Sequence, residues 1–204
     1  MPGQLFPTWS DMRVIAGKYR SRQLRSLPGL DLRPTADRLR ETLFDVLTAG
    51  NPTALTGTVW VDLYAGTGAV GIEAVSRGAA MVHFVESQGR AAELIKKNLD
   101  SLRVEEGFRI LKQDSARALH ALELSGAEAD FVFLDPPYDM EDAYRQALTL
   151  LSKSRLLKPQ SVVIAEHQKQ FDPGEGFESL RRYRELKQGD AALSFYRTRK
   201  ELRR

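Results

Sequence analysis

Residues 59–73 read VWVDLYAGTGAVGIE, which places a buried strand, a glycine turn and the start of a helix in one continuous stretch. The β-branched residues that lead to Val61 suit a central parallel strand. Gly66, Gly68 and Gly71 follow the G-x-G-x-x-G spacing, which gives a tight turn, close approach of the backbone to a ligand and close packing of the next helix. The stretch therefore predicts a nucleotide-binding crossover at the centre of an α/β sheet.

Asp62 narrows the choice of nucleotide. A carboxylate just before the turn would repel the pyrophosphate of a dinucleotide. S-adenosylmethionine (SAM) has no phosphate, and its sulfonium and ammonium groups would be attracted by a carboxylate. Asp62 therefore favours SAM over NAD. Glu86 lies eighteen positions after Gly68, at the end of the expected strand 81–86. An acid at this position can bind the ribose hydroxyls of either ligand.

Strand-like runs alternate with helical patterns along the rest of the chain. We expect strands at 81–86, 108–111, 131–134 and 161–165, helices at 89–102 and 144–157, and a break at Pro159. This alternation predicts a doubly wound parallel sheet of the Rossmann-like α/β class. Residues 183–187 and 193–197 flank the turn at Gly189 and predict an antiparallel C-terminal hairpin that closes one edge.

The chain divides into three segments. Residues 1–11 contain two prolines and no periodicity, which predicts a flexible leader. Residues 12–32 predict a small basic β-hairpin, with strands at 13–17 and 22–27 around a basic turn. Residues 33–204 form the main domain, which begins with a helix capped by Thr35. We expect Arg38 and Arg40 to lie off the apolar stripe of this helix.

Composition excludes several classes of protein. The 204 residues, 42% hydrophobic and 28% charged, suffice for one domain with an appendage. The sequence has no cysteine, which excludes disulfides and thiolate metal sites and fits a reducing compartment. The three histidines lack metal-ligand spacing. No apolar run reaches membrane-spanning length and the first residues lack a signal-peptide pattern, so we expect a cytoplasmic protein. We also expect a monomer without a metal ion.

Charge is distributed unevenly although the net charge is only +3. Residues 12–40 hold eight basic and two acidic residues, and residues 181–204 hold nine basic and three acidic ones. The remainder is acidic. Two basic ends that flank an acidic body indicate a polyanionic partner, although solvated charge near the termini is the alternative interpretation.

The tetrapeptide Asp135-Pro136-Pro137-Tyr138 follows the expected strand at 131–134. Ligands of open α/β sheets bind beyond the carboxyl ends of strands, so these residues should face the same crevice as the glycine turn. Consecutive prolines fix φ and remove N–H donors, which leaves the Asp135 carboxylate and the Pro136 carbonyl as a stiff pair of acceptors. This pair suits a planar amino group, and Tyr138 offers a ring for stacking an extruded base.

An exocyclic amine is a poor nucleophile because its lone pair is delocalised into the ring. Acceptors for both of its hydrogens stabilise the positive charge that develops on nitrogen as it attacks a methyl carbon. Alignment of the nitrogen, the methyl group and the sulfur could supply about 7–11 kcal/mol of the barrier. Asp114 would bind the adenine amino group of SAM, or cap the helix that begins at Ser115, or do both.

These motifs together resemble the RsmD family of bacterial 16S ribosomal RNA guanine-N2-methyltransferases. The resemblance covers residues 12 to about 199 and is carried by RVIAG (13–17), RPTADRLRE (33–41), DLYAGTG (62–68), FVE (84–86) and DPPY (135–138). It implies a class I SAM-dependent methyltransferase fold with seven strands and an N-terminal hairpin. It also implies methylation of one guanine in the small ribosomal subunit, assembled or assembling.

The resemblance assigns roles to three groups of residues. Catalysis belongs to Asp135, Pro136, Pro137 and Tyr138. Cofactor binding belongs to Asp62, Tyr64, Ala65, Gly66, Thr67, Gly68, Glu86, Ser87, Asp114, Ser115 and Asp135. RNA binding belongs to Arg13, Lys18, Arg20, Arg22, Arg33, Thr35, Arg38 and Arg40.

Other functions share parts of this pattern. A DNA adenine-N6 or protein glutamine methyltransferase would present an amino group to the same acceptors, although the chain has no DNA-recognition domain. An NAD-dependent oxidoreductase fits the glycine spacing and Glu86, whereas Asp62 and the two prolines disfavour it. A non-catalytic RNA-binding module would need neither the acids nor the prolines.

Overall fold

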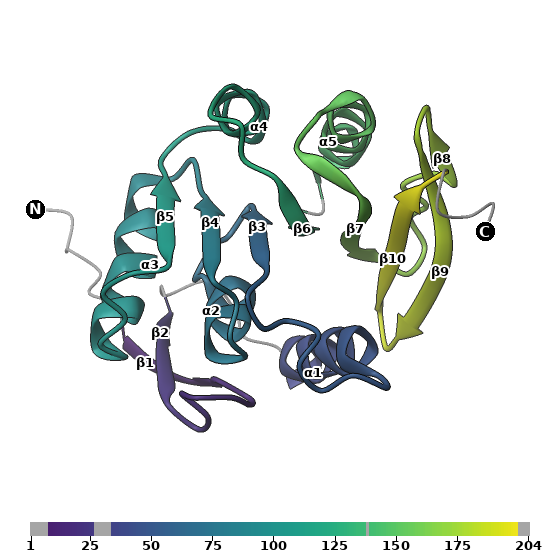
Figure 1. Cartoon of the computed structure of the whole chain (residues 1–204). Helices are drawn as coiled ribbons and strands as arrows, with labels where there is room; N and C mark the ends of the chain where they lie inside the picture. The colour runs from purple at the N-terminus through teal and green to yellow at the C-terminus, as the bar shows by residue number, and fades with distance from the viewer. Residues whose placement is uncertain (1–7, 27–33, 138, 200–204) are drawn as a thin grey trace, which may run out of the picture.

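Strand β3 (Val59–Leu63) lies in the middle of the main sheet, paired in parallel with β4 (Met81–Val85) and β6 (Ala129–Leu134). The structure is a computed structural model that describes residues 8–26, 34–137 and 139–199. The stretch that the sequence places at the centre of the fold therefore occupies the centre of the sheet (Figure 1).

The main sheet has the strand order β5-β4-β3-β6-β7-β10-β9-β8. Its remaining strands are β5 (Phe108–Leu111), β7 (Leu157–Gln168), β8 (Gly176–Phe177), β9 (Leu180–Gln188) and β10 (Ala191–Thr198). The first five strands in this order are parallel, whereas β10 is antiparallel to both β7 and β9. The expected seven strands are present, and the two-residue β8 adds an eighth at the edge.

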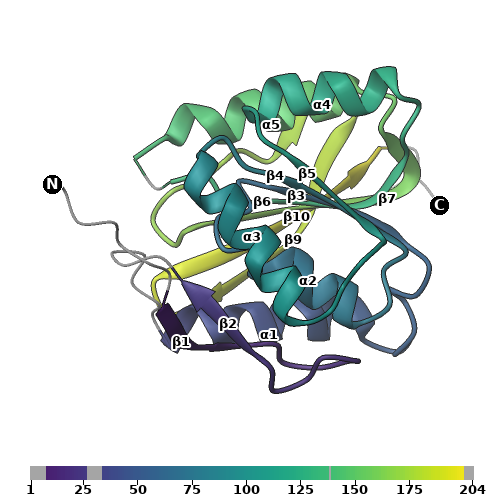
Figure 2. The same ribbon diagram turned by 90° about the vertical axis from the view of Figure 1, so that its left-hand side faces the viewer.

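Helices cover both faces of the sheet (Figures 1 and 2). One face carries α1 (Pro34–Thr48), α2 (Ala69–Ser76) and α3 (Gly89–Ser101), and the other carries α4 (Ser115–Leu124) and α5 (Glu141–Lys153). Alternation along β3 divides the core. The ring of Trp60 packs between those of Phe44, on which it stacks, and Phe131, against which it is tilted, with centroids 5.4 and 5.0 Å away. Val61 points to the opposite face and packs toward α4 and α5. The expected doubly wound class is confirmed.

The N-terminal hairpin pairs β1 (Thr8–Arg13) with β2 (Gln23–Ser26) outside the main sheet. The first strand thus begins inside the segment predicted as a leader, and the strand predicted at 13–17 is wrong. The N–H groups of Ile15 and Ala16 donate to the carboxylate of Glu73 on α2, at 2.7 and 2.9 Å, rather than to a partner strand. Docking against a helix replaces strand pairing there.

Several element bounds differ from the prediction. Helix α1 begins at Pro34, one residue before the predicted cap Thr35, because proline is pre-organised for the first helical position. Helix α5 ends at Lys153 instead of extending to 157. Strand β7 includes Pro159, which was expected to break the chain, because the pairing with β6 shifts register where the missing N–H would be needed.

The described part of the chain contains no helix that is both long and apolar enough to cross a membrane. Within the same residues, no cluster of histidine and acidic side chains has a geometry suited to a metal ion.

Candidate active site

The glycine turn between β3 and α2 is held in an unusual backbone conformation. Tyr64, Gly66 and Gly68 all have positive φ, at 64°, 54° and 80°. A non-glycine residue in this region stores strain that tends to occur at functional sites. A Cβ on Gly71 would lie 2.3 Å from the ring of Phe84, so α2 packs directly against β4. The turn therefore brings bare backbone to the carboxyl edge of the sheet.

Asp62, near the end of β3, stabilises this turn. Its buried carboxylate accepts the N–H of Gly71 at 2.9 Å, which fixes the first turn of α2. Burial raises the pKa of Asp62 to about 7, although the Gly71 N–H acts in the opposite direction; Asp135 and Glu86 raise it further. The sequence did not reveal the bond to Gly71, because it depends on how α2 returns over β3.

Glu86 joins the glycine turn to the loop after β4. One carboxylate oxygen accepts the N–H of Gly66 at 2.9 Å, and the other accepts the N–H of Gln88 at 2.7 Å. Each oxygen keeps a second lone pair, so the aligned carboxylate can still accept two hydroxyl groups. Ala65 and Thr67 complete the turn beside it, and Ser87 is exposed on the adjoining loop.

Asp114 follows β5 and caps α4. Its carboxylate accepts the N–H of Arg117 at 2.9 Å and pairs with the Arg117 Nε at 3.3 Å. The alternative of a helix cap is therefore confirmed, while a contact with adenine stays a prediction. Ser115 lies 2.8 Å from the hydroxyl of Tyr64, which connects the end of β5 with the glycine turn.

Asp135, Pro136 and Pro137 follow β6, directly beside the glycine turn that follows β3. Burial raises the pKa of Asp135 to about 7. The Pro136 carbonyl accepts the hydroxyl of Tyr144 at 3.4 Å, a weak bond that leaves one lone pair for a ligand. Tyr138 lies outside the described residues, so its stacking role stays a prediction.

A row of acids crosses this edge of the sheet. Asp62, Asp135 and Glu166 follow the inward-facing residues Trp60, Phe133 and Ile164 by two positions, so all three lie on the face covered by α1. They belong to the ends of three adjacent strands, β3, β6 and β7. Glu166 was missed in the sequence, although it follows the expected strand at 161–165 as Asp135 follows its own strand.

RNA contact would require Arg40 to lie on the surface, but Arg40 is buried. It is only 6% exposed, and its guanidinium donates to the Arg13 carbonyl at 2.6 Å and pairs with Asp37 at 3.1 Å. The helical period explains the error, because Arg40 precedes Phe44 by one turn and shares its buried side. Burial lowers the pKa of Arg40, although Asp37, Glu73 and Glu166 act in the opposite direction.

The other predicted RNA-binding cations are distributed along the hairpin and α1. Those with exposed side chains are Arg13, Lys18, Arg20, Arg22 and Arg38. Arg33 lies outside the described residues, as does the side chain of Thr35. Arg22 donates to the carbonyl of Ser101 at the end of α3, which places the hairpin turn at the amino edge of the sheet, away from the crevice.

The hairpin is docked through polar contacts with α2. Besides its bonds to Ile15 and Ala16, the buried carboxylate of Glu73 pairs with Arg77 at 2.7 Å. Ser76 accepts the N–H of Tyr19 at 2.9 Å. Gly17 has a φ of +80° and lies so close to Ser76 that a Cβ would be 2.0 Å from its carbonyl oxygen. The hairpin is therefore a fixed part of the fold.

Asn98 of α3 connects the hairpin to the glycine turn. The fully buried amide accepts the Arg25 N–H at 2.8 Å and donates to the carbonyls of Arg25 and Thr67 at 3.1 and 3.0 Å. One side chain thus fixes both β2 and the loop at the crevice. Nothing in the sequence signalled this role, because a single asparagine in a helix does not reveal its partners.

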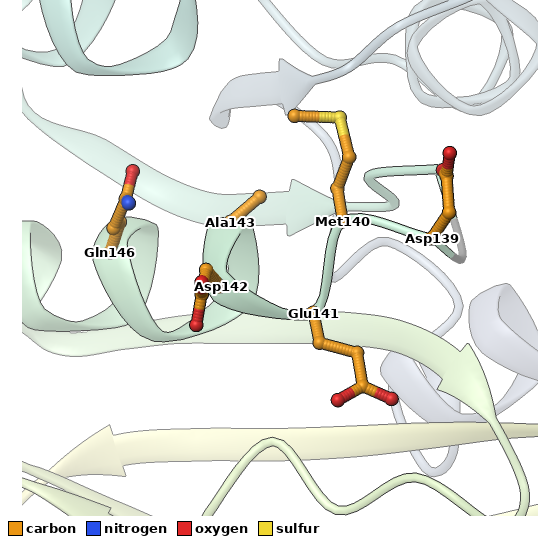
Figure 3. A pocket seen from close by; sticks show the side chains of 6 residues that line it. All are labelled: Asp139, Met140, Glu141, Asp142, Ala143 and Gln146. Carbon is orange, nitrogen blue, oxygen red and sulfur yellow. The ribbon is translucent and has the colours of Figure 1, made fainter.

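A hollow of about 440 Å³ lies at the start of α5, immediately beyond the tetrapeptide (Figure 3). Met140 and Glu141 point in opposite directions from the turn, and Met140 is half exposed. The lining residues are Asp139, Met140, Glu141, Asp142, Ala143 and Gln146. Three carboxylates on this rim would repel phosphates, which makes the hairpin side the better path for a polyanion.

Comparison with known proteins gives one family and several relatives. The family model described as Conserved hypothetical protein 95 matches residues 12–197. Ribosomal RNA small subunit methyltransferase D of Haemophilus influenzae is 37% identical over 160 residues, which are 78% of this chain and 80% of the relative.

Solved structures share the fold. A hypothetical protein of Thermus thermophilus, TTHA0928, has a TM-score of 0.75 at 27% identity, covering 90% of this chain and 97% of that chain. The T. thermophilus 16S rRNA N2 G1207 methyltransferase RsmC, solved with AdoMet and guanosine, has a TM-score of 0.73 at 20% identity. The match covers 97% of this chain and 52% of that chain, and this likeness concerns the fold alone.

Proposed function

The chain belongs to the Conserved hypothetical protein 95 family, the RsmD family, and on that premise we propose that it transfers a methyl group from SAM to the exocyclic N2 of one guanine in 16S ribosomal RNA. The observation that carries this proposal is the position of Asp135-Pro136 directly beside the glycine turn, in a chain related to ribosomal RNA methyltransferases. The hairpin is the RNA-binding extension of a methyltransferase domain that acts as a cytoplasmic monomer.

The residues at the crevice fit SAM. Bound there, SAM supplies an electrophilic methyl group on a positively charged sulfur. Glu86 holds two aligned oxygens for the ribose hydroxyls, as described above. Burial raises the pKa of both Asp62 and Asp135, so a cation between the two acids relieves the cost of their ionisation. NAD would instead bring a pyrophosphate toward these acids.

The tetrapeptide holds and activates the amine. Asp135 accepts one hydrogen of the guanine N2 and the free lone pair of the Pro136 carbonyl accepts the other, which stabilises the charge that develops on nitrogen. A pKa near 7 also suits Asp135 to take the proton that N2 loses after the transfer. The recessed position of Asp135 requires the target base to flip out of its stack.

The exposed cations of the hairpin hold the RNA. Lys18, Arg20 and Arg22 lie at the far end of α2, which is about 12 Å long, so they contact phosphates remote from the target nucleotide. Arg13 and Arg38 contact phosphates nearer the crevice. The cations position the substrate, and the pocket selects the base.

Methyl transfer from labelled SAM tests the proposal. The substrates are unmodified small ribosomal subunits, naked 16S RNA, duplex DNA and a release-factor protein, followed by nucleoside and amino-acid analysis. N2-methylguanosine in the RNA or subunit reactions supports the proposal, and comparison of the two identifies the natural form. Label only in DNA as N6-methyladenine, or only in glutamine, contradicts it and supports an alternative amino-group methyltransferase.

A further inference from the structure

Guanine presents three hydrogens side by side, two on N2 and one on N1. The proposed function, on which this inference rests, gives the N2 hydrogens to Asp135 and Pro136. The N1 hydrogen then lacks a partner in a pocket that excludes water. An unpaired N–H group in such a place weakens binding substantially, so a site built for guanine needs a third acceptor next to Asp135.

The strand register places Glu166 next to Asp135. Strands β6 and β7 are parallel and their ladder ends with Leu134 opposite Ala165, so Asp135 and Glu166 each follow the last pair. The two acids are close enough for Asp135 to raise the pKa of Glu166. Both side chains lie on the face that α1 covers, because they follow Phe133 and Ile164 by two positions. On its other side Glu166 pairs with Leu193 of β10, which fixes its backbone.

The carboxylate of Glu166 is available to a ligand. It is half-buried, and among residues 8–26, 34–137 and 139–199 it has no direct hydrogen bond or ion pair. Arg40 attracts it from α1, but the Arg40 guanidinium donates to the Arg13 carbonyl and Asp37 instead. Burial and the neighbouring Asp135 raise the pKa of Glu166, and Arg40 acts in the opposite direction. The acid therefore lacks the partner that a structural carboxylate normally has.

We propose that Glu166 accepts the N1 hydrogen of the target guanine and thereby makes the site specific for guanine. Adenine has no hydrogen on N1, so it cannot make this bond. The pair Asp135 and Glu166 thus reads two adjacent positions of one base edge. This pairing would let this protein reject adenine, although the tetrapeptide alone could hold the amino group of either base.

Turnover on unmodified small ribosomal subunits gives the first test. Glu166→Ala should lower kcat/KM for the subunit roughly 10- to 100-fold, while the Kd for SAM measured by calorimetry stays within about threefold of the wild-type value. Glu166→Gln should be less impaired, because its amide oxygen can still accept the N1 hydrogen. Glu185→Gln is the matched control, since Glu185 lies on β9 beyond β10 and ion-pairs with Lys187.

Competition by nucleosides gives the second test, with a readout that a structural role would not change. Guanosine and 2-aminopurine riboside both carry the amino group, but 2-aminopurine has a lone pair in place of the N1 hydrogen. The wild type should be inhibited more strongly by guanosine. In Glu166→Gln the side-chain amide can donate to that lone pair, so the preference should shrink or reverse. Both proteins should prefer guanosine over inosine, which lacks N2.

Two results would overturn the proposal: wild-type turnover in Glu166→Ala, or the same preference for guanosine over 2-aminopurine riboside in wild type and Glu166→Gln. Failure of the proposed function looks different, because the wild-type protein itself would then place no methyl group on guanine N2. If N2-methylguanosine forms and the Glu166 variants behave like the wild type, the role proposed for Glu166 is contradicted and the proposed function is not.

Discussion

Individual carboxylates at the crevice are poised between two protonation states. Burial raises the pKa of Asp62 and of Asp135 to about 7. An acid in this condition is uncharged at low pH and becomes charged when a positive group approaches. If SAM binds beside these residues as proposed, its binding and their ionisation should be linked.

Affinity for the cofactor should consequently depend on pH. The carboxyls lose their protons around pH 7. As the pH rises toward that value, the Kd for SAM should fall by up to roughly tenfold per pH unit for each proton released, and above it the Kd should level off. S-adenosylhomocysteine lacks the sulfonium charge, so its affinity should change less. Calorimetry with both ligands measures the difference, and Asp62→Asn should flatten the SAM curve. Equal slopes for the two ligands would contradict the linkage.

Asp135 should contribute chiefly to turnover. Asp135→Asn replaces the charged acceptor by a weaker one and should lower kcat by roughly 100- to 1,000-fold. The Kd for SAM should change far less, because Glu86 and the glycine turn are intact. Asp139→Asn, an exposed acid four positions later, should retain wild-type activity. A substantial kcat in Asp135→Asn would show that another group activates the amine.

Residue positions at strand ends were more predictable than residue partners. Asp62, Glu86 and Asp135 each follow an apolar run, and that pattern is sufficient to place them at the carboxyl edge. The bond from Asp62 to Gly71 and the neighbourhood of Glu166 depend on how elements meet in space. The burial of Arg40 was accessible from its spacing to Phe44, but its charge suggested the surface.

At the scale of elements, α2 is held by its close approach to β4. Gly71→Ala places a methyl group 2.3 Å from a Phe84 ring atom and should destabilise the protein by about 1–3 kcal/mol. Urea unfolding measures this change. Gly89→Ala, at the start of α3 with no atom near the added Cβ, should be neutral or slightly stabilising. Similar free energies of unfolding for both variants would contradict the packing argument.

Helix α3 should transmit changes in the hairpin to the cofactor turn. Asn98→Ala removes one acceptor and two donors, leaving buried backbone groups of Arg25 and Thr67 unpaired, and should cost about 1–3 kcal/mol of stability. The Kd for SAM, measured where the variant is folded, should rise roughly fivefold or more. Lys97→Ala, exposed on the same helix, is the control. An unchanged Kd would restrict Asn98 to a structural role.

The periodicity of the sequence predicted which segments are helices or strands. It did not predict where these elements begin and end, or how the hairpin packs against α2. The parallel strands were visible as short apolar runs separated by helical patterns. The hairpin strand was misplaced by about five residues because residues 15 and 16 satisfy their N–H groups on Glu73, a partner 57 positions away from Ala16. Pro159 was misjudged because local sequence does not reveal a shift in strand register.

For the whole molecule, positive and negative charge are separated between the hairpin and the start of α5. The hairpin presents exposed cations, whereas the start of α5 presents Asp139, Glu141 and Asp142. RNA that enters along the hairpin keeps its phosphates away from the acidic rim. Affinity for RNA should therefore depend on salt, while the affinity for SAM should depend on it much less.

Removal of hairpin cations should reduce that salt dependence. Lys18→Ala and Arg20→Ala together should lower the slope of log K against log salt by about 0.7–0.9 for each phosphate that the variant no longer neutralises. Binding of 16S RNA at several salt concentrations measures the slope, and the Kd for SAM should not change. Alanine at Lys153 and Arg155, exposed cations at and just after the end of α5, provides the control. An unchanged slope would show that Lys18 and Arg20 do not contact the RNA phosphates.

The polar docking of the hairpin also sets an order of events during synthesis. Residues 15–25 leave the ribosome first, but their partners Glu73, Asn98 and Ser101 lie 57 to 79 positions later in the chain. At about 5–20 residues per second the hairpin waits several seconds before its helices are made. The nascent protein thus completes the surface proposed to bind RNA only together with the loop proposed to bind the methyl donor.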